Sequence, residues 1–293
     1  MNRRMFLRVA GLSSIFYRSL LQNLSAAEMP VVAVAEGKEY DKITVNAVAA
    51  LGGMKRFVKS GDVVVIKPNI GWDRRPEQAA NTHPLVVKAL VEEALNAGAK
   101  RVKIFDRSCN DERRCYVNSG ITEILKNMKQ VELKYVEQER FKKVLLNGMA
   151  LREWELYGEA LSADVFINVP VAKHHGLTRL TLALKNIMGV MGENRGNIHR
   201  NIDHALVDVN AVLKSHLVVI DATRILTAHG PQGGDIEDVR ITNKVIASTD
   251  IVAADAYATT LFGLKPADIG TTVAAYRRGL GEMNLNRIRV VRV

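Results

Sequence analysis

The stretch that decides the fold is Val63-Val64-Val65-Ile66, followed at once by Lys67-Pro68-Asn69. Four consecutive β-branched residues, preceded by the turn Ser60-Gly61-Asp62, predict a strand that is buried on both faces, as in a parallel sheet. The chain then turns polar at a lysine. Because ligands of open parallel sheets bind beyond the carboxyl ends of the strands, this junction is the first place to look for a site.

Outward from this strand, short β-branched runs alternate with helical patterns along the chain. This alternation predicts an α/β fold, a mostly parallel sheet with helices on both faces. The polar stretch 137–162 indicates an inserted loop or hairpin, and the absence of repeats and long linkers favours one large domain over residues 28–293. Further strands are predicted at 31–34, 102–105, 131–136, 165–169, 217–220, 244–248 and, at a sheet edge, 288–293; helices are predicted at 42–58, 84–96, 119–128, 250–262 and 266–279.

The composition excludes several classes of protein. A chain of 293 residues, 47% of them hydrophobic, can bury a sizeable core and is not expected to be disordered. Its two cysteines cannot supply the four thiolates of an ordinary iron-sulfur cluster, so no cluster is expected within this chain. The net charge of +10 favours anionic partners, but with 5% aromatic residues a nucleic acid ranks last among them.

Residues 1–27 have the layout of an export signal. They contain Arg3, Arg4, Arg8 and Arg18, no acidic residue, and end in Ser25-Ala26-Ala27. The opening resembles a twin-arginine signal, which predicts a periplasmic or other extracytoplasmic location. The alternative is a basic amphipathic helix that stays on a cytoplasmic protein. The apolar part is too short and polar for a transmembrane span. Loss of these four arginines would lower the net charge from +10 to +6.

Polar side chains follow four of the predicted strands. Lys67 and Asn69 follow 63–66, Asp106 follows 102–105, Lys173 and His174 follow 165–169, and Asp221 follows 217–220. Polar residues after strands are common, so only the four cases together favour a site. In a parallel sheet these groups share one rim, and lysine, histidine and carboxylate side chains there suit anion binding and proton transfer.

Three glycine-bearing or helix-initial segments add candidate contacts to this rim. If residues 178–188 are helical, Leu184 and Met188 face the core, while Lys185 and Asn186 lie near the helix end, beside Gly189. Such a stretch can cradle phosphate or carboxylate, although a solvated glycine loop has the same composition. The remaining candidates are Gly230 and Gly233, which also suit an ordinary turn, and Thr82 and His83, which cap a helix by default and otherwise bind an anion there.

Histidine and cysteine chemistry is less specific here. Six of the seven histidines fall between positions 174 and 229, and His199 with Asp203 are the candidate ligands of a divalent metal. Each histidine taken alone is more often a surface or hydrogen-bonded residue than a ligand. For Cys109 and Cys115 a structural disulfide in an exported chain ranks above redox catalysis, and metal ligation ranks last, but the sequence does not decide whether the disulfide forms.

An ordered set of motifs runs through nearly the whole chain. It comprises Lys67-Pro68-Asn69; Thr82-His83-Pro84; Asn168-Val169-Pro170 with Lys173 and His174; Leu184-Lys185-Asn186 with Gly189; Asp221 with Gly230-Pro231 and Gly233; and Ala247-Ser248-Thr249-Asp250 with Asp255. Over roughly residues 30–285 the set resembles the domain of unknown function 362 family. The resemblance implies no particular reaction. Many members carry a ferredoxin-type cysteine motif, which this chain lacks, so any redox partner would be a separate protein.

Together these features predict a protein that binds a small anionic substrate or cofactor at the carboxyl rim of its sheet, with a metal or as a redox-associated enzyme. The alternative is a ligand or metal carrier without catalysis, and the pattern decides neither the reaction nor the oligomeric state. The assigned roles are catalytic for Lys173, His174, Lys185 and Asp221; cofactor-binding for Lys67, Asn69, Thr82, His83, Asn186, Gly189, Gly230 and Gly233; and metal-binding for His199 and Asp203.

Overall fold

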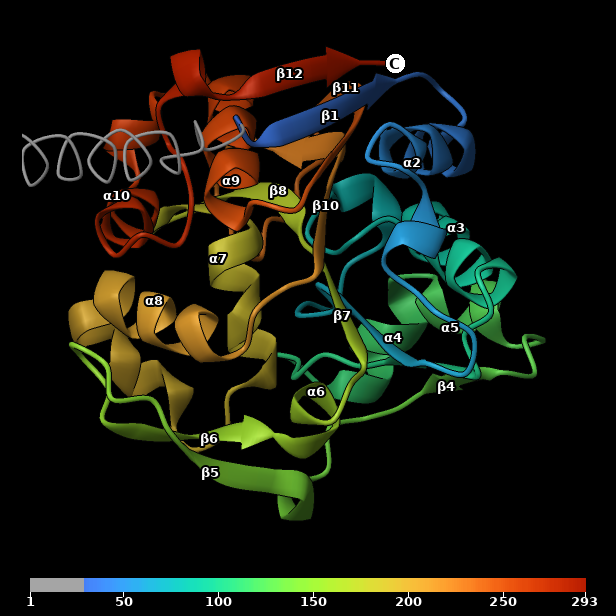
Figure 1. Ribbon diagram of the computed structural model, residues 1–293, viewed down its shortest axis with the longest axis horizontal. Helices are drawn as coiled ribbons and strands as arrows, with labels where there is room; N and C mark the ends of the chain where they lie inside the picture. Colours follow the sequence, from blue (N-terminus) through green and yellow to red (C-terminus); the bar gives the residue numbers. More distant parts are fainter. Residues whose placement is uncertain (1–28) are drawn as a thin grey trace, which may run out of the picture.

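The computed structural model describes residues 29–293 (Figure 1), so the predicted export signal lies outside the described residues. A mixed sheet forms the centre. Along its main path the antiparallel strand is β11, which runs against both of its neighbours, whereas the other pairs on this path are parallel, as predicted. In spatial order the path is β12 (Arg289–Arg292), β1 (Val31–Glu36), β11 (Val239–Ser248), β10 (Leu217–Leu226), β7 (Val165–Val169), β2 (Val63–Pro68), β3 (Arg101–Ile104) and β4 (Val131–Leu133).

Strand β2, which contains the run Val63-Val64-Val65-Ile66, lies inside the sheet, between β3 and β7. Val64 and Ile66 pack into one apolar core, and Val65, pointing the opposite way, packs into another. This alternation is what a strand covered on both faces requires. Its carboxyl end pairs Lys67 with Asn168 of β7, which sets the position of the lysine at the rim.

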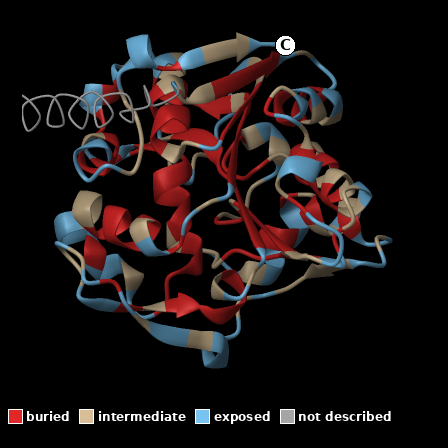
Figure 2. Ribbon diagram, viewed as in Figure 1, coloured by how far each residue is buried: buried red, intermediate tan, exposed pale blue. Residues whose placement is uncertain are grey.

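Helices cover both faces of the sheet, and the buried residues gather between them and the strands (Figures 1 and 2). None of the helices among residues 29–293 is long and apolar enough to cross a membrane. One face carries α2 (Tyr40–Ala49), α3 (Pro84–Asn96), α4 (Glu112–Asn118) and α5 (Ile121–Leu125); the other carries α6 (Gly158–Leu161), α7 (Ala183–Asn186), α8 (Ile202–Val212), α9 (Ile251–Thr259) and α10 (Gly270–Arg277).

The chain does not end its extended course at β7. Pro170, which lacks a backbone N–H, interrupts the strand, and β8 (Val171–His175) continues beside β10 in parallel. β9 (Arg179–Thr181) then folds back antiparallel on β8. The consequence is that Lys173 pairs with Leu226 at the carboxyl end of β10 and with Thr181 of β9, which places it at the rim.

The predicted insertion is a hairpin of β5 (Phe141–Leu145) and β6 (Glu153–Tyr157). Its tip is tied to the domain by Asp208 of α8, a buried carboxylate that accepts hydrogen bonds from the backbone of residues 149–151 at 2.7–2.9 Å. The hairpin therefore closes the lower side of the core, as Figure 1 shows.

Several predicted helices are shorter than expected, because local signals end or divide them. The helix expected over 42–58 ends at Ala49, shortly before Gly52 and Gly53, which take positive φ. Within the range 119–128 only α5 (Ile121–Leu125) is helical, and Gly120 at positive φ separates it from α4, which ends at Asn118. The helix over 250–262 finishes in a 3-10 turn, and the one over 266–279 begins only at Gly270.

The helix considered over 178–188 is wrong. Residues 179–181 form strand β9, Leu182 is extended, and only Ala183–Asn186 are α-helical before a 3-10 turn. Asp255 of α9 explains the late start: its carboxylate accepts hydrogen bonds from the N–H groups of Ala183 and Leu184 at 2.8 and 2.9 Å, so it caps the helix from another element. Such a cap is invisible in the local sequence.

Candidate functional site

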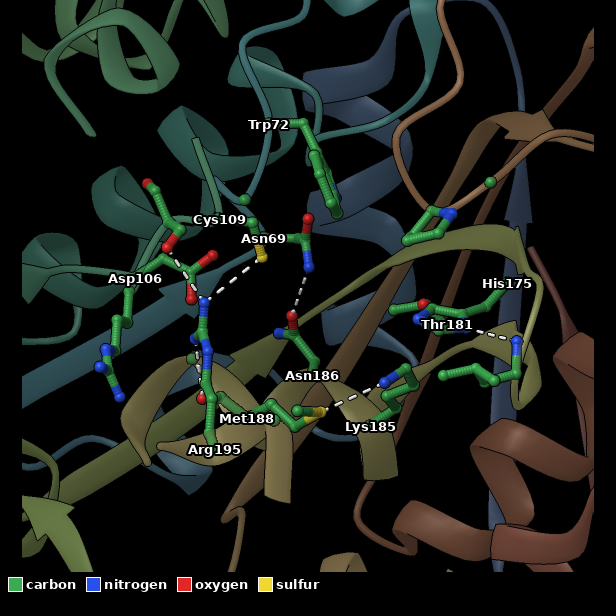
Figure 3. A pocket seen from close by; sticks show the side chains of 18 of the residues that line it. Asn69, Trp72, Asp106, Cys109, His175, Thr181, Lys185, Asn186, Met188 and Arg195 are labelled. Atoms are coloured by element: carbon green, nitrogen blue, oxygen red, sulfur yellow. Dashed lines mark hydrogen bonds between the residues drawn. The ribbon is translucent and has the colours of Figure 1, made fainter. Parts of the chain in front are cut away.

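A cavity of about 850 Å³ lies at the carboxyl ends of β2 and β3, where β8 and α7 meet them (Figure 3). Its walls come from segments far apart in the sequence: the ends of β2 and β3, strands β8 and β9, helix α7, and the loops around 193–199 and 230–231. The predicted rim, at which lysines follow the strands, therefore borders a cavity.

A buried ion pair forms the floor of the cavity. Lys67 Nζ lies 2.8 Å from Asp106 Oδ1, and both side chains are almost completely buried. Asp106 Oδ2 in turn accepts a hydrogen bond from Ile70 N at 2.6 Å. Burial lowers the pKa of Lys67, and the Asp106 carboxylate opposes that shift. Because the Asp106 carboxylate already neutralises the Lys67 ammonium, Lys67 has a structural role at the floor of the cavity and does not need a ligand as its counter-ion.

Gly189 lets the 3-10 turn after α7 approach this pair. A Cβ at that position would lie 1.7 Å from Asp106 Oδ1 and 2.5 Å from Lys67 Nζ. Only glycine fits without displacing the ion pair. Gly189 was predicted to help bind a ligand, whereas the contact that requires glycine at this position is with the Asp106 carboxylate.

Two asparagines connect the floor to the next lysine. Asn186 Oδ1 accepts hydrogen bonds from Lys67 Nζ at 2.9 Å and from Asn69 Nδ2 at 3.1 Å. Asn69 Oδ1 then accepts one from Lys173 Nζ at 3.1 Å. The amide groups thus relay the positions of two lysines, and substituting either asparagine would disturb both.

Lys173 is fully buried and faces the cavity. Its Nζ donates to Ala80 O at 2.5 Å and lies 5.9 Å from the centre of the Trp72 ring. Burial lowers the pKa of Lys173 to about 7, and the positive charges of Lys185 and Lys67 act in the same direction. At neutral pH this amine therefore exists in both protonation states, as suits a group that transfers protons.

Lys185, on α7, differs from the other two lysines in its partners. It is 8% exposed, and its Nζ donates to the thioether sulfur of Met188 at 3.2 Å; no oxygen acceptor contacts it among residues 29–293. Burial lowers the pKa of Lys185 to about 8. On the same wall, the hydroxyl of Thr181 is buried and has no hydrogen-bond partner within the described part of the chain. Both residues line the cavity (Figure 3), and among the described residues neither polar group has an oxygen partner.

Two arginines flank the mouth. Arg195 donates to Met188 O at 3.1 Å, to Ser108 O at 3.0 Å and to the Sγ atom of Cys109 at 3.3 Å. Arg107 donates to Met191 O at 2.8 Å and also lines the cavity. With the lysines inside, these guanidinium groups give the cavity a strongly cationic character that favours anionic ligands.

His175 is the histidine that the fold brings into the cavity from β8. Its Nδ1 accepts a hydrogen bond from Leu177 N at 3.1 Å, and burial together with the positive charges of Lys185 and Lys173 lowers its pKa to about 3. It is therefore neutral at physiological pH. His174, its neighbour, points to the other side of the strand and accepts from Gly230 N at 3.1 Å.

The structure brings together most of the residues singled out in the sequence, and it adds others. The cavity is lined by Lys67, Asn69, Lys173, Lys185, Asn186, Gly189, His199 and Gly230. Outside it lie Thr82, His83, His174, Asp203, Asp221 and Gly233. Asp106, expected at the rim, and Cys109 also line the cavity; lining residues to which the sequence assigned no role include Trp72, Arg107, His175, Thr181 and Arg195.

The residues outside the cavity are hydrogen-bonded within the protein. Asp221, fully buried, accepts from His83 N at 2.7 Å and from Thr223, so it fixes the start of α3 instead of facing the rim. Thr82 donates to Val169 O at 2.7 Å. Asp203 accepts from a threonine of α10 at 2.6 Å and is not beside His199 in the cavity. Within residues 29–293 no group of three or more histidine, cysteine, aspartate or glutamate residues is arranged to hold a metal ion.

The disulfide that ranked first for Cys109 and Cys115 is not formed, because both cysteines are free. Cys115 lies on the inner side of α4 and packs in the apolar core, where burial raises its pKa to about 11. Cys109 lies in the loop before that helix and lines the cavity. The two side chains therefore lie in different environments, Cys115 in the apolar core and Cys109 at the cavity.

Fold and site together define a class: an α/β protein with a lysine-rich cavity at the carboxyl edge of a mostly parallel sheet. Residues 64–260 match the family model described as Domain of unknown function (DUF362), and the chain belongs to this family, as its motifs predicted. It is 30% identical over 238 residues to a thylakoid-associated protein of Synechocystis sp., in an alignment that covers 78% of this chain and 72% of that protein.

Two solved structures are similar to this chain at low sequence identity. One is the lactate racemase apoprotein from Thermoanaerobacterium thermosaccharolyticum, with a TM-score of 0.48 and 12% identity over 78% of this chain and 56% of that one. The other is a protein from Thermotoga maritima, with a TM-score of 0.46 and 12% identity over 78% of this chain and 60% of that one. The chain thus spans less than two thirds of the length of each.

Proposed function

We propose that this protein binds a small organic anion in the cavity and that a carboxylate or phosphate oxygen of the ligand accepts hydrogen bonds from Lys185 and Thr181. The observation that carries the proposal is the state of Lys185, a lysine that is 8% exposed and has only a thioether as partner among the described residues. A buried ammonium without a counter-ion is costly, and an anionic ligand removes that cost.

The dimensions and the lining of the cavity favour an organic anion over a simple inorganic one. A volume of about 850 Å³ is within the range of sites for metabolite-sized ligands. Trp72 and Met188 contribute apolar surface beside the lysines, so the ligand has a body to bury as well as a charge to neutralise. His175, being neutral, adds a polar contact without adding charge.

Lys173 supports a catalytic form of this function. Its pKa of about 7 makes it a base that can take a proton from a bound molecule and return it at neutral pH. Its hydrogen bonds to Asn69 and to Ala80 O fix the position of the amine. We therefore assign it the transfer of a proton to or from the bound anion, with Lys185 holding the anion in place.

Binding is tested by calorimetric titration of the protein with glycolate, succinate, malonate and inorganic phosphate. At least one of the organic anions should bind, and Lys185→Met should weaken it by tenfold or more, which corresponds to about 1.4 kcal/mol. The matched control is Lys214→Met, which removes an exposed lysine outside the cavity and should leave the affinity unchanged. Equal affinities of wild type and Lys185→Met would contradict the proposal, as would the absence of binding to the whole panel.

A second measurement distinguishes an enzyme from a ligand carrier without catalysis. If Lys173 exchanges a proton with a carbon acid, the C–H next to the carboxylate of bound glycolate should exchange with deuterium in D₂O, and proton NMR follows the loss of its signal. Lys173→Met should abolish the exchange. Binding without exchange in the wild type assigns the protein to the carrier alternative.

We further propose that residues 1–27 direct export of the folded protein. The support is the arginine pattern at Arg3, Arg4 and Arg8 and the description of the Synechocystis relative as thylakoid-associated. Replacing both Arg3 and Arg4 by lysine should retain the protein in the cytoplasm, as measured by cell fractionation. An unchanged distribution would show that the two arginines have no such role.

A further inference from the structure

Cys109 lies at the mouth of the cavity and is held in a fixed orientation. Its Sγ accepts a hydrogen bond from Arg195 at 3.3 Å, and its backbone N–H donates to Gly71 O at 2.8 Å. Arg195 is itself fixed by Ser108 O and Met188 O, so the guanidinium and the sulfur are presented together (Figure 3). The residue is exposed, and a small reagent can reach it.

The sulfur belongs to the cationic cavity in electrostatic terms as well. Negative charge at Cys109 raises the pKa of Lys67, of Lys173 and of Lys185, so the sulfur lies within interaction range of all three amines. An anion drawn in by these lysines therefore arrives beside the thiol.

Two further polar groups of the same cavity lack an oxygen partner among the described residues. The Thr181 hydroxyl, in a side chain more than nine-tenths buried, has no partner within residues 29–293, and the Lys185 ammonium has only a sulfur. Neither Cys109 nor Arg195 is a hydrogen-bond partner of the Thr181 hydroxyl or of the Lys185 ammonium. The thiol thus stands at the edge of a site whose interior still needs an acceptor.

We propose that Cys109 is a nucleophilic thiol of the cavity, selective for small organic anions that carry an electrophilic carbon. The inference rests on the proposed function, because the lysines that hold the carboxylate also bring the electrophilic carbon to the sulfur. In the reaction the thiol proton is lost to water or a base, the thiolate sulfur forms a thioether bond with the carbon, and the leaving group departs with the electron pair of the broken bond.

The test compares alkylation of the full protein by iodoacetate, an anion, with alkylation by neutral iodoacetamide. Both reagents consume the same thiolate and release iodide, so the ratio of their rate constants reports the local field and cancels the fraction of thiolate present. Rates come from intact-protein mass spectra, the modified residue from peptide mapping, and the reference thiol is N-acetylcysteine amide in the same buffer.

The iodoacetate to iodoacetamide ratio at Cys109 should exceed that of the reference thiol by at least about tenfold, as electrostatic steering allows. Cys115 should stay unmodified, because it is buried in the core. Arg195→Gln and added salt should each lower the ratio toward the reference, whereas Arg200→Gln, which removes an exposed arginine of the same 3-10 turn outside the cavity, should not.

A ratio equal to that of the reference thiol overturns the inference, and so does equal labelling of Cys109 and Cys115. The salt dependence of the wild type keeps the test decisive if Arg195→Gln does not fold. Calorimetry on Cys109→Ser with succinate and glycolate separates this failure from failure of the proposed function: if only the inference on Cys109 is wrong, binding persists, and if the anion site itself is wrong, binding is absent.

Discussion

Replacing Lys185 with methionine should stabilise the empty protein while it weakens anion binding. Burial lowers the pKa of this lysine from 10.5 to about 8. One pKa unit corresponds to about 1.4 kcal/mol, so at pH 7 the folded state is about 3 kcal/mol less stable than it would be with an unperturbed lysine. Methionine fills a similar space without charge and can still contact Met188. The variant should therefore gain up to about 3 kcal/mol in free energy of unfolding.

The pH dependence gives this prediction its sign. Between pH 8 and 10.5 the unfolded chain binds a proton at Lys185 that the folded protein does not bind. Raising the pH through this window therefore stabilises the wild type, and the cost is fully present below the folded-state pKa. The advantage of Lys185→Met should shrink to about 1 kcal/mol near pH 9.5.

Urea unfolding of both proteins at pH 7 and pH 9.5 measures these differences, with Lys214→Met as the control for loss of an exposed lysine. Two results would refute the reasoning. One is a variant that is less stable than the wild type at pH 7, and the other is an advantage of the same size at both pH values. Either would mean that Lys185 is not a destabilising buried charge in the empty protein.

Three further substitutions test neighbouring parts of the site. Asp106→Asn leaves the Lys67 ammonium without its counter-ion and should lower the free energy of unfolding by about 3–5 kcal/mol in urea; a loss below about 1 kcal/mol would deny the pair its role. Gly189→Ala places a Cβ against Asp106, so both thermal stability and anion affinity should fall, and an unaffected variant would contradict the packing. Thr181→Val should change the stability of the empty protein by no more than about 1 kcal/mol yet weaken anion binding measured by calorimetry; unchanged affinity would exclude the hydroxyl as a contact.

The fold could be predicted because its decisive signals are local. Val64, Val65 and Ile66 fill the cores on both faces of the sheet, and the polar switch at Lys67 falls at the carboxyl end of the strand. The edge strand at 289–292 and the 141–157 hairpin follow from the same kind of reasoning. Features that depend on a distant part of the chain could not be predicted: the start of α7 depends on Asp255, more than seventy residues away.

The site could be predicted only in part, for the same reason. Lys173 and Lys185 were found because they follow recognisable elements, but the side to which a residue points needs the strand register, which puts His175 in the cavity and His174 outside it. Asp221 follows a strand as Lys67 does, yet its carboxylate is occupied by the backbone at the start of α3. Cys109 lies on a loop and Arg195 at the start of a 3-10 turn, neither with a periodic pattern, and only the order of strands brings them together.

The central claim is that buried lysines of low pKa receive an anion in this cavity, and proton uptake on binding tests it most directly. At pH 8, Lys173 with a pKa of about 7 and Lys185 with a pKa of about 8 are largely and partly unprotonated in the empty protein. A bound negative charge favours their protonated forms. Calorimetric titration with glycolate or succinate, whichever binds more tightly, in two buffers of different ionisation enthalpy should therefore show uptake of about one proton per anion, reduced in Lys173→Met. Binding with no proton uptake would contradict the account.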